Sequence, residues 1–238
     1  MAGDGNGTDA GGTGAAVQGF MALPRPMDDG RQQLLRCLDD LVEVVGLDVA
    51  PADRGDEWRW GRRVGAAFRK ASRQGPLVLP ETSFDTLMTA AVYDPDPSFN
   101  RWWLEPALNA FGRRRVCTAL LAILRTGTDV ERAGAARAWY WAALPLRLPG
   151  VVAEIAGVES QVEPDDPAEL AREWNAAALR EFVTNEHLDV RRCIIPVLPL
   201  WKSAYGNELH GLLDTAIAIA RSHPDEYIRH RVEHQVRS

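Results

Sequence analysis

Cysteine and long apolar runs are both scarce in this sequence, and each scarcity excludes a class of protein. The three cysteines (Cys37, Cys117 and Cys193) lie far apart, and each falls within an apolar pattern of helical period. An odd number of isolated cysteines predicts buried free thiols in a reducing compartment, with no zinc-binding spacing. No apolar run approaches the roughly 20 residues needed to span a bilayer. The N-terminal residues also lack the basic and apolar regions of a secretion signal. We therefore expect a cytoplasmic protein with no membrane span.

Motifs that carry catalysis or bind cofactors are absent too. The sequence contains no P-loop, GxGxxG, GxSxG or HExxH motif and no paired-carboxylate motif. His230 and His234 are four residues apart, but a metal site needs a third ligand, so we interpret them as part of a solvated helix face. We expect no cofactor, no metal and no catalytic residue, although distant residues can still assemble an active site in a repeat protein.

Lysine is nearly missing, with 2 lysines beside 25 arginines in a chain of net charge −6. Together with abundant alanine and glycine, this preference is typical of a GC-rich, bacterial genome. A net-acidic protein is not attracted as a whole to nucleic acid or to anionic membranes, so any basic site must be local. The charge balance thus disfavours nucleic acid as a partner without excluding it.

The apolar pattern divides the chain into a tail and one helical domain. Residues 1–27 are rich in glycine and then punctuated by proline, which predicts a disordered tail. From residue 28 to residue 238 the apolar residues recur at helical spacing. The one β-like fragment, LVL at 77–79, is enclosed by Pro76 and Pro80, and we interpret it as a linker. The predicted fold class is therefore all-α.

Five segments of this domain resemble one another. They are GDEWRWGRR at residue 55, DPDPSFNRWW at 94, TDVERAGAARAW at 128, LDVRRCIIPVL at 188 and HPDEYIRHRVEH at 223. Each has an acidic turn, an aliphatic or aromatic residue, usually an arginine, and then a helix. Each also follows another amphipathic helix, so helix pairs recur about every 35–45 residues, which is typical of an α-solenoid. One longer interval contains a Pro-rich acidic insert at about 145–165, expected between the two helices of one pair.

The start of the fourth segment, Asp189-Val190-Arg191, resembles the start of the second helix in a HEAT repeat, and Asp225, Ile228 and Arg229 repeat the pattern. The resemblance spans residues 31–238 and implies a right-handed α-solenoid of about five HEAT-like helix pairs. It also implies that the acidic residue caps the helix and that Arg191 reaches toward the neighbouring repeat. The next residue, Arg192, is then expected to be solvated.

A run of basic residues is the first candidate binding site. No acidic residue interrupts residues 58–80, and the candidates are Arg59, Arg62, Arg63, Arg69, Lys70 and Arg73. On a helix they form a basic face opposite an apolar stripe, suited to an anionic partner. The alternative is an ordinary solvated face in an arginine-rich protein. Arg113, Arg114 and Arg115 form a second, smaller cluster.

Tryptophans on two adjacent second helices are the other candidates: Trp102 and Trp103 in one set, and Trp139 and Trp141, on either side of Tyr140, in the other. Neighbouring helix positions point about 100° apart, so one ring of each set should enter the core. The other ring is expected either on the concave surface, as a binding hot spot, or against the next pair. Trp102-Trp103 is similar to a paired tryptophan in HEAT-like DNA glycosylases that repair alkylated bases, but Leu104 and Glu105 follow where a carboxylate is expected directly.

These features predict a non-catalytic HEAT-like scaffold or adaptor that binds another macromolecule on its concave or basic face, with a protein as the favoured partner. One alternative is a HEAT-like nucleic-acid-binding protein or a DNA glycosylase acting on alkylated bases. Another is a small-molecule site lined by the tryptophans.

Overall fold

The computed structural model describes residues 21–26, 30–51, 56–74, 77–144, 151–153 and 167–236. Within them, ten α-helices hold most of the residues: α1 (Arg31–Val45), α2 (Glu57–Gln74), α3 (Ser83–Tyr93), α4 (Arg101–Phe111), α5 (Arg113–Thr126), α6 (Asp129–Ala142), α7 (Pro167–Thr184), α8 (Leu188–Ile194), α9 (His210–Ser222) and α10 (Glu226–Gln235). Short 3₁₀ turns η1 (Ile195–Val197), η2 (Lys202–Ala204) and η3 (Asn207–Leu209) connect α8 to α9. The prediction of an all-α chain is confirmed, apart from one pair of three-residue strands.

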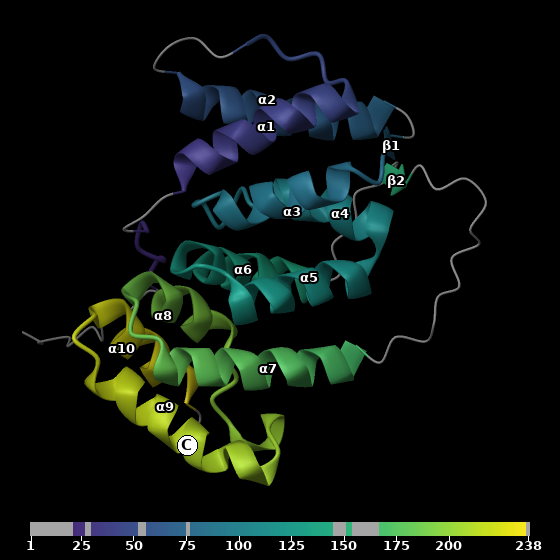
Figure 1. The fold of residues 1–238 in the computed structure, drawn as a ribbon. Helices are drawn as coiled ribbons and strands as arrows, with labels where there is room; N and C mark the ends of the chain where they lie inside the picture. The colour runs from purple at the N-terminus through teal and green to yellow at the C-terminus, as the bar shows by residue number, and fades with distance from the viewer. Residues whose placement is uncertain are drawn as a thin grey trace, which may run out of the picture.

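Consecutive helices pack as five pairs, and the pairs follow one another down the molecule (Figure 1). Among the odd-numbered helices, α1 packs on α3, α5 packs on α7, and α7 packs on α9. Among the even-numbered helices, α4 packs on α6 and α6 packs on α8. The even-numbered helices begin at or a few residues after the acidic turns of the five similar segments. The acidic turns therefore located the second helix of each pair.

The acidic insert lies elsewhere than expected. Residues 145–166 join α6 to α7, so they connect two successive pairs and do not interrupt one pair. Most of this insert lies outside the described residues, as does the predicted tail except for residues 21–26. Sequence spacing alone could not distinguish the two positions, because both lengthen the same interval between second helices.

The interpretation of LVL at 77–79 as a linker is wrong. These residues form β1 (Leu77–Leu79), which pairs in parallel with β2 (Val151–Ala153), and Leu77 lies opposite Val151. Leu79 is fully buried. A parallel partner always arrives through a long connection, so nothing near β1 in the sequence could reveal it.

Helix α6 is buried along its middle, where every residue from Ala133 to Trp139 is shielded from solvent. Gly134 lies directly against the backbone carbonyl of Val92 at the end of α3, with no space for a Cβ atom. Arg137 donates from Nη2 to the same Val92 oxygen at 3.2 Å and from Nη1 to the Cys193 sulfur at 3.4 Å. The guanidinium therefore caps the negative end of α3 inside the core.

Polar side chains also link successive pairs, but Arg191 is not the residue that does so at α8. Arg191 donates to the carbonyls of Phe182 and Val183, at the end of its own partner helix α7. Arg192 instead reaches Asp225 at the start of α10, with only 16% of its side chain exposed. The expectation of a solvated Arg192 is wrong, because the bridging side chain lies one residue further around the helix.

Candidate functional site

The six basic candidates of α2 divide into two faces. Arg62 and Arg69 point toward α4, on the side where Gly65 lies against the Trp102 ring. Arg62 Nη2 lies 3.2 Å from Asp96 Oδ2, and its guanidinium covers the Phe99 ring. The acids that complete this face come from the next helix pair, so the absence of acids between residues 58 and 80 is misleading.

The second of these contacts is an ion pair between Arg69 and Glu105. Arg69 Nη1 donates to Glu105 Oε2 at 2.6 Å, and only 9% of the Glu105 side chain is exposed. A nearly buried carboxylate and a partly exposed guanidinium at this distance hold α2 against α4. Arg62 and Arg69 therefore have structural contacts and lie away from the solvated side of the helix.

The remaining four cations form one exposed line, here called the outer stripe: Arg59, Arg63, Lys70 and Arg73. Together with exposed Ala66 they follow a spacing of four, three, four and three residues, which keeps them on one side of the helix. At 1.5 Å per residue the stripe extends over about 21 Å. Two of them form ion pairs with Asp56: Arg59 Nε lies 3.5 Å from its Oδ1, and Arg63 Nη1 lies 3.2 Å from its Oδ2. Among the described side chains, none forms an ion pair with Lys70 or Arg73.

The first tryptophan pair packs between helices. Trp103 is buried and donates from Nε1 to Asp94 Oδ2 at 3.0 Å. Trp102 is half-buried, between Gly65 of α2 and the edge of Phe99. One ring thus enters the core and the other fills the contact between successive pairs.

The second tryptophan set behaves similarly. Trp139 stacks on Trp174 of α7 with ring centroids 3.9 Å apart and planes 2° from parallel. Trp141 donates from Nε1 to the Pro97 carbonyl at 2.7 Å, in the turn before α4. In the described part of the chain, two aromatic side chains are about half exposed: Tyr140, which lies between Trp139 and Trp141, and Trp201, which was not among the candidates.

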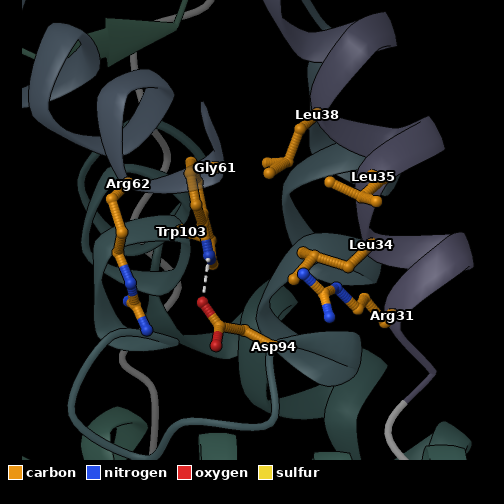
Figure 2. Close-up of a pocket in the computed structure, with 8 residues that line it drawn as sticks. All are labelled: Arg31, Leu34, Leu35, Leu38, Gly61, Arg62, Asp94 and Trp103. Atoms are coloured by element: carbon orange, nitrogen blue, oxygen red, sulfur yellow. Dashed lines mark hydrogen bonds between the residues drawn. The ribbon is translucent and has the colours of Figure 1, made fainter. Parts of the chain in front are cut away.

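Asp94 lies beside a small cavity between α1, α2 and the turn before α4 (Figure 2). Its Oδ1 accepts the Asp96 backbone N–H at 3.0 Å, while its Oδ2 accepts from Trp103. Burial raises the pKa of Asp94 above its ordinary value, and the hydrogen bonds and nearby Arg62 oppose this only in part. A shifted carboxyl group in a pocket is a candidate for catalysis.

The size of this cavity argues against catalysis. It measures about 10 Å³ and its lining residues are Arg31, Leu34, Leu35, Leu38, Gly61, Arg62, Asp94 and Trp103. Such a space holds about one water molecule. Both carboxylate oxygens already accept hydrogen bonds from the chain, so Asp94 fixes the turn before α4.

A larger hollow of about 680 Å³ lies beside the same turn. It is lined by Leu23, Pro24, Arg25, Pro26, Arg31, Pro95, Asp96 and Pro97.

The smaller arginine cluster lies at the start of α5. Arg113 donates to the Leu144 carbonyl, and Arg115 pairs with Glu81 while its guanidinium covers the Phe84 ring. The smaller arginine cluster is thus partly engaged in holding α5.

No group of three or more His, Cys, Asp and Glu side chains converges on a possible metal position within the described residues. Nor does any helix in those parts of the chain have the length and apolar content needed to cross a membrane. No family model, no curated protein and no solved structure matches this chain. Any functional conclusion must therefore come from the site geometry.

Proposed function

We propose that the five helix pairs are HEAT-like repeats of a right-handed α-solenoid, and that this protein is a non-catalytic scaffold or adaptor that binds another protein. Two inter-pair contacts support the repeat assignment. Arg62 of α2 reaches Asp96 in the turn before α4, and Arg192 of α8 reaches Asp225 before α10. In both places an arginine of one second helix bonds to the acidic turn that opens the next.

The outer stripe of α2 carries the proposal of binding. Its four cations face solvent along about 21 Å of helix, which matches the length of about four turns of a partner helix. Exposed charges of one sign raise the local concentration of an oppositely charged partner and fix its orientation. The partner that fits is a protein segment with acidic side chains along one face.

A protein is favoured over nucleic acid for two reasons. The protein carries a net charge of −6, so the molecule as a whole repels a polyanion. Proteins that bind duplex DNA tightly commonly contact about 6–10 phosphates, more than one four-residue stripe supplies.

The test reverses three cations of the stripe in one variant, Arg63→Glu, Lys70→Glu and Arg73→Glu. The matched control reverses three exposed cations of other helices, Arg36, Arg180 and Arg221, and so changes the net charge equally. Arg62 and Arg69 stay unchanged, because reversing them would break contacts between α2 and α4. Both variants should keep the far-UV helicity of the natural chain.

Each protein is then immobilised and used to capture proteins from a host extract over a range of salt concentrations. We expect acidic proteins that the natural chain and the control retain at low salt to be lost from the stripe variant. Added salt screens exposed charges, with a Debye length of about 8 Å at physiological ionic strength, so the natural chain should release these proteins as the salt concentration rises.

The natural chain and the two variants are also tested for retention of a duplex DNA fragment. DNA retention that disappears only in the stripe variant would favour the nucleic-acid alternative. Equal protein capture by all three at every salt concentration would rule out the stripe as a binding surface.

A further inference from the structure

Residues 21–26 precede α1 in the sequence, yet their first residue lies against the last helix pair. The Met21 backbone N–H donates to His230 Nε2 of α10 at 3.2 Å, across 209 positions of sequence. Met21 and Leu23 are also partly buried against the apolar core. This segment is here called the N-terminal strap.

Two further contacts trace the path between α10 and α1. Residues 23–26 face the Pro95–Pro97 turn between α3 and α4 across the larger hollow. Gly30, directly before α1, lies against the Tyr93 ring of α3 and near Val130 of α6. Its φ of +53° favours glycine, and a side chain there would overlap Tyr93. Figure 1 shows the purple strap leaving the start of α1 toward the side where α8 and α10 lie.

The length of chain between the two ends sets a limit on their separation. Ten residues lead from Met21 to the start of α1 at Arg31, and ten residues reach at most about 33–36 Å. The strap itself contains no helix or strand. While Met21 is bonded to His230, α10 cannot move further than this from the start of α1.

We propose that the N-terminal strap ties the fifth helix pair to the first and so restricts opening of the stack. In a stack of repeats, each unit otherwise contacts only its neighbours, and the end units open independently. The strap adds a direct connection between the ends, and its release from His230 frees the last pair. This inference does not depend on what the outer stripe binds.

Amide hydrogen exchange in α10 tests the strap, because it reports how often the last pair opens. One truncation removes residues 2–20 and leaves the strap, and the other removes residues 2–26. We expect only the longer truncation to raise the exchange rates of the α10 amides. The increase should be about two- to tenfold, the range for one lost hydrogen bond of ordinary strength.

A second variant separates the strap contact from other roles of His230. His230→Ala in the full chain should raise α10 exchange by a similar factor, and it should add little once residues 2–26 are gone. Glu233→Ala, at an exposed position of the same helix, is the control and should change nothing in either background. Unchanged α10 exchange after the longer truncation would overturn the proposal. So would a His230→Ala effect of equal size with and without the strap.

Discussion

Arg192 holds Asp225 with two hydrogen bonds, from Nε at 3.2 Å and from Nη2 at 2.6 Å, and thereby joins α8 to the start of α10. The other oxygen of Asp225 caps α10 by accepting the Ile228 N–H at 3.1 Å. Burial acts to raise the pKa of Asp225, but the bonds from Arg192 and Ile228 outweigh it and hold that pKa below its ordinary value. One carboxylate therefore starts the last helix and ties it to the preceding pair.

Replacing Arg192 should cost more stability than replacing Arg191. Arg192→Ala leaves Asp225 and the buried Asp189 without their cation and should cost about 2 kcal/mol of unfolding free energy. Arg191→Ala loses hydrogen bonds to two carbonyl oxygens and a distant contact with the Phe182 ring, and it should cost about 1 kcal/mol. Urea denaturation of the two variants gives both values. An equal or larger effect at Arg191 would contradict this assignment.

Alanine substitutions on the two faces of α2 should differ in their effect on the unfolding free energy, again measured by urea denaturation. Arg69→Ala removes the cation beside Glu105 and should cost about 2–3 kcal/mol, because the carboxylate stays nearly buried. Arg73→Ala, on the exposed face, should change stability by less than about 0.5 kcal/mol. If the Arg73 variant proved as unstable as the Arg69 variant, the outer stripe would have structural contacts as well.

Glycine at position 134 should be required by the approach of α6 to α3. An alanine there would place its Cβ on the Val92 carbonyl oxygen, which the backbone of α3 holds in place. We expect Gly134→Ala to cost about 3 kcal/mol in urea denaturation. The control is Gly211→Ala in α9, where a Cβ would meet nothing within 4 Å. That change should cost nothing, and helix propensity should favour it by up to about 1 kcal/mol. Similar behaviour of the two variants would refute the close approach.

Much of the helical layout could be predicted from the sequence because it depends on local patterns. The apolar period located the helices, and the acidic turns located the second helix of each pair. The cap at Asp225 also follows from residue type and position alone. Each of these features is determined within about one helical turn of the chain.

Features that depend on distant residues were not predictable in the same way. The basic face looked uniform in sequence, yet Asp96 and Glu105 of the next pair engage Arg62 and Arg69 and leave the outer stripe solvated. The choice between Arg191 and Arg192 depends on how α8 is rotated against α10. The bond from Met21 to His230 joins the two ends of the described chain, and no local signal marks either residue.

His223 should make the protein less stable in mild acid. The side chain is buried, and its Nδ1 accepts the Asp225 N–H at 3.0 Å, so the folded state favours the neutral ring. Burial lowers the pKa of His223, and the guanidinium groups of Arg191, Arg192 and Arg229 lower it further.

The direction of the pH effect follows from this lowered pKa. As the pH falls below about 6.5, the ordinary value for histidine, the unfolded chain binds a proton at His223 that the folded chain does not bind. The unfolding free energy should therefore decrease between pH 7.5 and pH 5.5, by at most about 1.4 kcal/mol per pH unit from this residue. The lowered pKa of Asp225 acts in a separate range, near and below its ordinary value of 3.8.

The measurement is urea denaturation at pH 7.5, 6.5 and 5.5 for the natural chain and for His223→Asn. The asparagine Oδ1 can accept the same Asp225 N–H but does not titrate, so the variant should show a shallower loss of stability over this range. Comparing how steeply the unfolding free energy changes with pH in the two proteins removes any constant cost of the substitution itself. Parallel curves for the two proteins would mean that His223 takes up its proton equally in the folded and unfolded states. The buried ring would then have no part in the acid sensitivity of the last helix pair.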